Sequence, residues 1–383
     1  MKHRLHSLQC IIPPFMLKSI YDNGSAAQKQ AATAAVVASA QIRARRQALS
    51  EIVGQSAAAA TGAGKQRRVY TASNGSTLPG TLVRDEGSAP VSDVAVNEAY
   101  DGAGATYDLY WDIYQRNSVD GNGLRLDSSV HYEQGYDNAF WDGQQMVYGD
   151  GDGQLFNRFT IALDVIGHEL THGVTQYTSN LNYSNQSGAL NESISDIFGS
   201  LVKQRVRNQT AATADWLIGQ GLFTPQVKGV ALRSMKEPGT AYDDPVLGKD
   251  PQPGNMRDYV NTSQDNGGVH INSGIPNHAF YLMAIAIGGY AWEKAGMIWY
   301  VAQRDKFNNN TDFQSAADLT YAVAGQLYGQ GSQEQQGVKY GWDGVGITIG
   351  AQPQPQPQPQ PSGCLAAPAA FVRTIFGGTP PRQ

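Results

Sequence analysis

Two neighbouring stretches with helical periodicity constrain the fold of this 383-residue chain most. They span about residues 161–202 and read TIALDVIGHELTHGVTQYT and GALNESISDIFGSLVKQ. The first contains His168 and His172, which are four residues apart and therefore lie on one face of a helix, one turn apart. Two imidazoles in this arrangement can bind one metal ion from the same side. The first stretch therefore predicts a helix that carries two ligands of a metal site.

The second stretch supplies a third ligand. Zinc in hydrolases takes three protein ligands and keeps one position open for water. Glu192 lies in the second predicted helix, 20 residues after His172, and we predict that it completes the ligand set with His168. There is an alternative for each part of the pattern, because a bare H-E-x-x-H string also occurs by chance and a lone glutamate can be a surface acid. The helical setting of both stretches favours the zinc site.

Glu169 follows the first histidine directly and is predicted to face the open position instead of the metal. Because zinc acidifies water, Glu169 can accept a proton and pass it to a leaving amine, as a catalytic base. Ligand imidazoles also need partners that fix their orientation. Asp196 is placed to hold His168 and Asn191 to hold His172, although an ordinary helix charge is the alternative for Asp196.

The order of the secondary-structure signals predicts an α+β fold with two lobes. Residues 69–160 are rich in Gly, Asp, Asn, Tyr and Val in short alternating runs, which predicts strands and turns. Helical patterns dominate afterwards, with further helices expected at 274–288, 291–304 and 312–328. We expect a β-rich catalytic lobe at 69–178, which includes the zinc-binding helix, and an α-helical lobe at 179–350, with the active-site cleft between them.

The two ends of the chain differ from its body. Residues 1–68 carry a net charge of +8, so the rest of the chain carries −13. A basic arm and an acidic body should associate, with a solvated tail as the alternative, and the acidic body argues against nucleic-acid binding. Within the arm, 25–53 is Ala-rich and predicts a helix, and 56–68 predicts an exposed linker in which Arg67 and Arg68 are open to proteases. Residues 351–383 begin with a Pro-Gln repeat, which predicts an extended, solvated tail.

Cysteine content and hydropathy limit the kinds of protein that this chain can be. The two cysteines, Cys10 and Cys364, lie in the terminal segments, so no disulfide framework and no cysteine-based zinc site is expected in the core. No apolar run approaches the ~20 residues that a membrane-spanning helix needs. The start of the chain is basic, but Pro13 and Pro14 interrupt its short apolar stretch, so a Sec signal is not evident and a transit peptide is the alternative.

Three strings, HELTHGVTQYT, NESISDIFG and DNGGVHINSGIPNHAFY, resemble the thermolysin-like neutral zinc metalloproteases. The similarity covers about residues 70–349. It implies two lobes around a cleft whose floor is the helix with His168 and His172. It also implies an endopeptidase that cuts peptides before bulky hydrophobic residues, and we expect it to be secreted and monomeric. Cytoplasmic storage or non-Sec export are the alternatives. A non-enzymatic binding protein, an exopeptidase or an amidase are the competing readings, and the complete set of motif residues argues against them.

The resemblance also assigns roles to residues outside the metal site. His270 matches the histidine that stabilises the tetrahedral oxyanion, Asp265 matches the acid that orients it, and Tyr183 shares the task. A cationic imidazole acts best where negative charge develops. The substrate-binding residues implied are Asn138 and Ala139 on an edge strand, Arg233 for a substrate carbonyl, and Phe156, Phe159, Val165 and Leu232 for an apolar pocket. For these last four, plain core packing is the alternative.

The chain departs from the family pattern at the double calcium site. Asp164 and Asp215 match two of the expected acids, but the other positions hold Lys203, Leu217 and Gln220. Calcium sites need several oxygen ligands with enough negative charge. We therefore expect weak or absent calcium binding there.

The N-terminal arm resembles the short prosegment of protealysin-type members through IIPPFMLKSIYDNGS. The resemblance implies a zymogen in which residues 14–17 fill the cleft until the chain is cleaved near residues 50–69. Cys10 raises the alternative of a cysteine switch, but the spacing gives it no support.

Overall fold

The computed structural model describes residues 9–52 and 64–351. Its main sheet has six strands in the order β1-β5-β6-β4-β2-β3. The pairs β2–β4 and β4–β6 are parallel, and β1–β5, β5–β6 and β2–β3 are antiparallel. In the order of the sheet, the strands are β1 (Gln9–Cys10), β5 (Ala139–Trp141), β6 (Met146–Tyr148), β4 (Leu126–Val130), β2 (Arg67–Thr71) and β3 (Thr81–Asp85).

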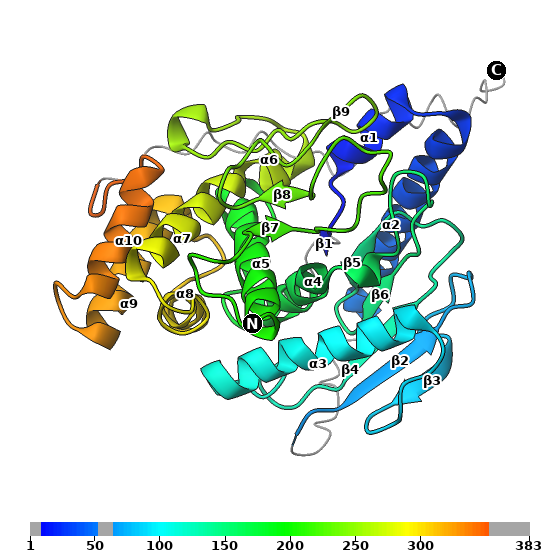
Figure 1. Ribbon diagram of the computed structural model, residues 1–383, viewed down its shortest axis with the longest axis horizontal. Helices are drawn as coiled ribbons and strands as arrows, with labels where there is room; N and C mark the ends of the chain where they lie inside the picture. The colour runs from blue at the N-terminus through cyan, green and yellow to red at the C-terminus, as the bar shows by residue number, and fades with distance from the viewer. Residues whose placement is uncertain (1–8, 53–63, 352–383) are drawn as a thin grey trace. The chain divides into compact units, whose positions relative to one another are not determined.

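Helices α4 and α5 form the centre of the fold (Figure 1). They span Leu163–Gln176 and Asn185–Val206, so both helices expected around residues 161–202 are present. The two helices approach closely where glycines face each other: a Cβ at Gly167 would lie 3.0 Å from the Cα of Gly199. Because no side chain separates them there, ligands on the two helices can meet.

The second half of the chain is mainly helical, as expected for the second lobe. Its helices are α6 (Asp265–Asn272), α7 (Gly274–Ile287), α8 (Lys294–Asp305), α9 (Phe313–Tyr328) and α10 (Gln333–Gly344). The predictions at 274–288, 291–304 and 312–328 match α7, α8 and α9. Two short two-stranded sheets lie between α5 and α6: β7 (Leu217–Ile218) pairs with β8 (Arg233–Ser234), and β9 (Asp243–Asp244) pairs with β10 (Gly248–Lys249). Single 3₁₀ turns occur at Phe159–Ile161 and Met256–Asp258.

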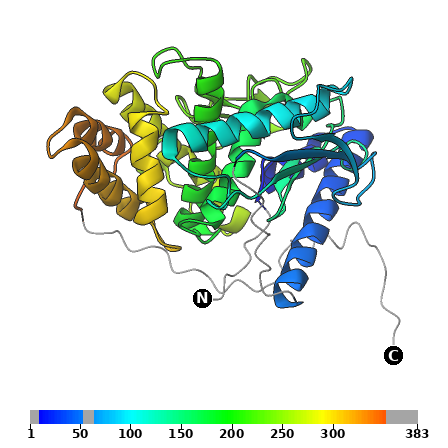
Figure 2. The same cartoon turned by 90° about the horizontal axis from the view of Figure 1, so that it is seen from below.

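The β-rich reading of residues 69–160 missed α3, a 21-residue helix at Val94–Tyr114. It begins at Asp93, whose side chain accepts the N–H groups of Ala95 and Val96, as helix N-caps do. Figure 2 shows α3 lying in front of the central helices, against which it packs. Its two glycines, Gly102 and Gly104, lower helix propensity locally, and packing against α4 and α5 overrides this.

The expected linker at 56–68 is wrong in its last residues. Residues 53–63 lie outside the described part of the chain, but Arg67 and Arg68 are in β2. Arg67 Nη2 pairs with Glu86 Oε1 at 2.6 Å, and Arg68 Nε pairs with Asp85 Oδ1 at 3.0 Å. Acids on the neighbouring strand and its turn therefore hold these arginines in the sheet, so they are not a free protease site.

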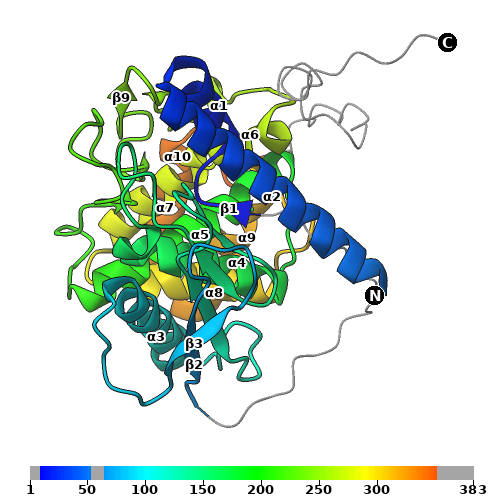
Figure 3. The same ribbon diagram turned by 90° about the vertical axis from the view of Figure 1, so that its right-hand side faces the viewer.

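The N-terminal segment is folded onto the rest of the chain. After β1 come α1 (Pro14–Asn23) and α2 (Ala26–Ile52), the long helix expected from the Ala-rich run. Figure 3 shows α2 as the long diagonal helix that follows α1. The apolar side chains of this segment are buried, and they include Ile11, Ile12, Met16, Leu17 and Ile20. Within residues 9–52 and 64–351, no helix is long and apolar enough to span a bilayer.

Candidate active site

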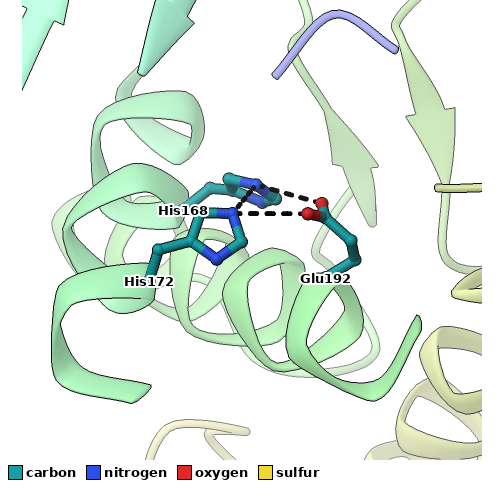
Figure 4. A group of neighbouring side chains, drawn as sticks. All are labelled: His168, His172 and Glu192. Atoms are coloured by element: carbon teal, nitrogen blue, oxygen red, sulfur yellow. Dashed lines mark hydrogen bonds and ion pairs between the residues drawn. The ribbon is translucent and has the colours of Figure 1, made fainter. Parts of the chain in front are cut away.

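The three predicted ligands converge between α4 and α5 (Figure 4). The Nε2 atoms of His168 and His172 are 3.0 Å apart. The carboxylate oxygens of Glu192 lie 3.5 Å from Nε2 of His168 and 3.6 Å from Nε2 of His172. All three side chains are buried. In the described ranges, this is the one group of three or more His, Cys, Asp or Glu side chains that could hold a metal ion.

The outer nitrogens of both imidazoles have protein partners. His168 Nδ1 lies 2.8 Å from Asp196 Oδ1, and His172 Nδ1 lies 2.9 Å from Asn191 Oδ1, as predicted from the sequence. Ser195 Oγ, which the sequence reading missed, is also 2.9 Å from His172 Nδ1. Because these partners bind the Nδ1 atoms, the Nε2 atom of each histidine is left to bind a metal ion. The two imidazole nitrogens and the carboxylate lie within 4.8 Å of one another, and they form a ligand set that fits zinc.

The electrostatics of the centre favour a cation. Burial opposes charge on His168, but Asp196 and Glu192 outweigh it and raise its pKa to about 9. The same negative field attracts a metal ion. Burial lowers the pKa of His172 to about 3, so its imidazole is neutral, as a metal ligand must be.

Arg233, predicted to contact the substrate, also holds one of the side chains that orient the ligands. Its Nε and Nη2 atoms donate to the two oxygens of Asp196, each at 2.8 Å. Asn277 Nδ2 donates to Asp196 Oδ2 at 2.9 Å. Burial by itself raises the pKa of Asp196, but the Arg233 and His168 charges outweigh it and hold that pKa well below its usual range. The sequence reading did not include Asn277, because its partner comes from a helix 81 positions earlier in the chain.

Glu169 lies beside the ligands with one oxygen uncommitted. Its Oε2 accepts the backbone N–H of Trp141 at 3.1 Å, whereas Oε1 is buried and has no hydrogen-bond partner among the described residues. Burial raises the pKa of Glu169 to about 8. A buried carboxyl oxygen without a partner costs free energy, and such costs concentrate at functional sites.

The loop with the sequence DNGG brings Asp265 onto His270. Gly267 and Gly268 have φ of +89° and +76°, and a Cβ at Gly267 would lie 2.2 Å from Asn185 Oδ1, so the turn requires glycine there. Asp265 Oδ1 is 2.6 Å from His270 Nδ1, and Asp265 Oδ2 accepts the His270 N–H at 2.8 Å. Burial works against charge on His270, but Asp265 and Glu192 raise its pKa to about 9.

Tyr183 joins this histidine to the metal ligands. Its hydroxyl lies 3.2 Å from His270 Nε2 and also donates to Glu192 Oε1. Gln252 Nε2 donates to the His270 carbonyl at 2.8 Å, a contact that no sequence signal indicated. The residues with predicted chemical roles, His270, Tyr183 and Asp265, are thus gathered around Glu192.

The N-terminal segment lies in the cleft beside the residues of the site. Cys10 pairs with Phe140 across β1 and β5, and the N–H of Ile12 donates to Asn138 Oδ1 at 3.0 Å. Residues 14–17, expected to fill the cleft, form the first turn of α1, and Phe15 and Met16 line a small cavity with Arg233 and His270. Pro14 is favoured at the start of a helix because it lacks an N–H and its φ is fixed.

The four expected pocket residues are almost fully buried, at 0–2% exposure. Leu232 lines a small cavity together with Pro13, Phe15 and Met16 of the N-terminal segment. Phe156 and Phe159 contact each other with ring centroids 5.8 Å apart. Direct substrate contact by Phe156, Phe159, Val165 and Leu232 stays a prediction.

At the expected calcium positions, the ammonium of Lys203 lies among carboxylates. Its Nζ is 2.9 Å from Asp164 Oδ2 and 2.7 Å from Asp215 Oδ1, and it donates to the Leu217 carbonyl at 2.6 Å. Gln220 is exposed. Burial favours the neutral amine, but Asp164 and Asp215 outweigh it and raise the pKa of Lys203.

Comparison with known proteins agrees with this geometry. Residues 21–176 match the family model described as thermolysin metallopeptidase, catalytic domain, and residues 179–347 match its alpha-helical domain. The chain belongs to the thermolysin metallopeptidase family. It is therefore a metalloprotease, a hydrolase that acts on peptides, and the predicted fold class and resemblance are confirmed.

Individual relatives of this thermolysin-family chain extend the match. An extracellular metalloprotease of Pectobacterium carotovorum subsp. carotovorum is 49% identical over 340 residues, which cover 88% of this chain and 96% of that protein. Bacillolysin of Bacillus cereus is 45% identical over 287 residues, 73% of this chain and 48% of that protein. Among solved structures, the precursor of protealysin, a metalloproteinase from Serratia proteamaculans, superimposes with a TM-score of 0.80 at 52% identity, covering 89% of this chain and all of that one.

Proposed function

We propose that this metalloprotease is a zinc-dependent endopeptidase that hydrolyses peptide bonds before bulky hydrophobic residues and is made as a self-inhibited zymogen. The convergence of His168, His172 and Glu192, with an oxygen of Glu169 beside them, carries the proposal. Its similarity to an extracellular metalloprotease supports secretion, and its similarity to the protealysin precursor supports a prosegment. We keep the proposed division into a prosegment (1–68), two catalytic lobes (69–178 and 179–350) and a tail (351–383), with β2 already part of the first lobe.

Each residue of the site has a task in this mechanism. When bound by His168, His172 and Glu192, zinc supplies Lewis-acid chemistry: it polarises the carbonyl and acidifies water. Glu169 takes a proton from the attacking water and passes it to the leaving amine. His270, charged and oriented by Asp265, and Tyr183 donate hydrogen bonds where negative charge develops on the carbonyl oxygen.

In this mechanism the substrate is bound by the start of β5, by Arg233 and by an apolar pocket. Asn138 and Ala139 pair with the substrate backbone as an edge strand does. Arg233 donates to a substrate carbonyl while Asp196 fixes its position. The side chain after the scissile bond enters the apolar pocket of Phe156, Phe159, Val165 and Leu232, which excludes charged groups because their desolvation would cost free energy.

Removal of the metal is the first test. We expect purified protein to contain about one zinc per chain, as a single three-ligand site holds. Its cleavage of a casein-type substrate should stop with a zinc chelator and return when zinc is added. Casein cleavage that a chelator does not affect would contradict zinc dependence. If zinc is present without cleavage, limited proteolysis should release activity, because the prosegment then blocks the cleft.

The prosegment interaction can be weakened at one buried side chain. Met16 is 1% exposed and lines a cavity with Asp250 and His270. Met16→Asp places a second carboxylate beside Asp250 and removes apolar burial, which together cost several kcal/mol of docking. We expect the full-length variant to cleave peptides at least ~10-fold faster than the parent, since ~1.4 kcal/mol already changes an equilibrium tenfold.

The matched control for this variant is Lys18→Ala, two residues away on the exposed side of α1. The Lys18 side chain is 56% exposed, and its pair with Asp22 is a surface interaction worth little. Its rate should equal that of the parent. Equal rates for Met16→Asp and the parent, with both proteins folded by circular dichroism, would contradict inhibition by the prosegment.

A further inference from the structure

The N-terminal strand runs through the cleft in one defined direction. β1 pairs antiparallel with β5, with Cys10 opposite Phe140. Beyond β1, the N–H of Ile11 donates to the Ala139 carbonyl at 3.2 Å, and the N–H of Ile12 donates to Asn138 Oδ1 at 3.0 Å. Successive backbone groups of the strand are thus bound by successive groups of the edge strand.

Two consecutive carbonyls of this strand are bound from the opposite side. The Cys10 carbonyl oxygen is 3.2 Å from His270 Nε2, and Tyr183 is hydrogen-bonded to the same nitrogen. The next carbonyl, that of Ile11, accepts from Arg233 Nη1 at 3.4 Å. In the proposed mechanism, His270 donates a hydrogen bond to the carbonyl that reacts, and Arg233 donates to another carbonyl of the substrate. The register therefore places the carbonyl of Cys10 at the reacting centre and Ile11 directly after it.

The side chains fit the same register. Ile11 and Ile12 are 0% and 1% exposed, so both are enclosed. Ile11 is a bulky apolar residue, the type proposed to follow the scissile bond. A strand held in the opposite direction would offer its carbonyls and N–H groups to different partners, and the four contacts above exclude that arrangement for this segment.

We propose that the Cys10–Ile11 peptide bond is a self-cleavage site of this enzyme, an inference that rests on the proposed peptidase function. The reaction is hydrolysis: one water adds to the Cys10 carbonyl carbon, and the bond from this carbon to the Ile11 nitrogen breaks. Cys10 gains a carboxylate, and the nitrogen leaves as a new α-amine at Ile11. The part of the segment that continues into α1 keeps its contacts, so this cut alone does not release the inhibitor.

Product mapping of the full chain tests the site. After incubation with zinc, mass spectrometry should find a chain or peptide that begins at Ile11, or one that ends at Cys10. Glu169→Gln should yield neither product, and Ile11→Asp should lose this cut, because an apolar pocket excludes a carboxylate. Casein cleavage by a protein whose Cys10–Ile11 bond stays intact would overturn the inference alone. Absence of both casein cleavage and self-cleavage would overturn the proposed function as well.

A second readout does not depend on the metal or on activity. Because the Cys10 side chain is only 8% exposed, its thiol should react slowly with a thiol reagent in metal-free Glu169→Gln protein that also carries Cys364→Ser. Adding Asn138→Ala removes the side-chain acceptor of the Ile12 N–H, and Ile11→Asp removes the enclosed apolar group. Both should speed labelling at least ~10-fold, the change expected for ~1.4 kcal/mol. Equal labelling rates in all three proteins would show that the strand does not hold this register.

Discussion

The Glu169→Gln variant is expected to bind zinc normally and to hydrolyse peptides at least ~10³-fold more slowly than the parent enzyme, within the range known for loss of a general base. Glutamine has nearly the same shape as glutamate, and its amide oxygen can still accept the Trp141 N–H that now bonds Glu169 Oε2 at 3.1 Å. It cannot take up a proton from water at neutral pH. The ligands His168, His172 and Glu192 are untouched, so the metal stays.

The measurement combines kcat on a short peptide with zinc content by elemental analysis, after limited proteolysis has removed the prosegment. Glu293→Gln, an exposed position just before α8, is the matched control and should keep the parent's kcat. Near-normal kcat in Glu169→Gln would contradict its role as base. Loss of zinc together with activity would mean that Glu169 supports the metal site instead of the proton transfer.

The metal site could be predicted because its determinants are local. His168 and His172 share a helix face through their spacing alone, and Glu192 lies on the next helix in the chain. The partners Asp196 and Asn191 follow from the same two helices, and the structure brings both within 2.9 Å of the imidazoles. The order of the signals, strands first and helices second, predicted the correct fold class, which the family match confirms.

Contacts between residues far apart in the chain were not predicted, because no local sequence pattern indicates them. Asn277 reaches Asp196 across 81 positions, and the Cys10 carbonyl reaches His270 across 260. Phe15 and Met16 line a cavity with His270, in keeping with the expectation for residues 14–17, but the helix that these residues begin was not predicted. The preference of proline for the first position of a helix explains why α1 starts at Pro14. Helix α3 was missed because glycine-rich sequence weakens its periodic signal, while its stability comes from packing against helices that follow it in the chain.

Replacement of Lys203 is expected to have the largest effect on stability. The Lys203 ammonium is 3% exposed and lies between Asp164, 1% exposed, and Asp215. Lys203→Met leaves the buried Asp164 without its counter-charge, whereas Arg207 still pairs with Asp215 at 3.1 Å. Breaking a buried ion pair from one side costs about 3–5 kcal/mol. The exposed pair of Lys339 and Asp343 provides the control, because Lys339→Met should change the unfolding free energy by no more than ~1 kcal/mol.

The same position tests whether the lysine replaces calcium. If the ammonium supplies the positive charge at this site, millimolar calcium should leave the parent's melting temperature unchanged. Lys203→Glu adds a third carboxylate beside Asp164 and Asp215, so this variant should melt far lower than the parent in a chelator and regain stability with calcium, whose oxygen ligands it restores. Lys203→Met should also melt lower than the parent but should not respond to calcium, since it offers no new oxygen. A parent enzyme that calcium stabilises would show that the acids bind the ion despite Lys203, and a Lys203→Glu variant that calcium does not rescue would show that Leu217 and Gln220 leave the site too poor in ligands.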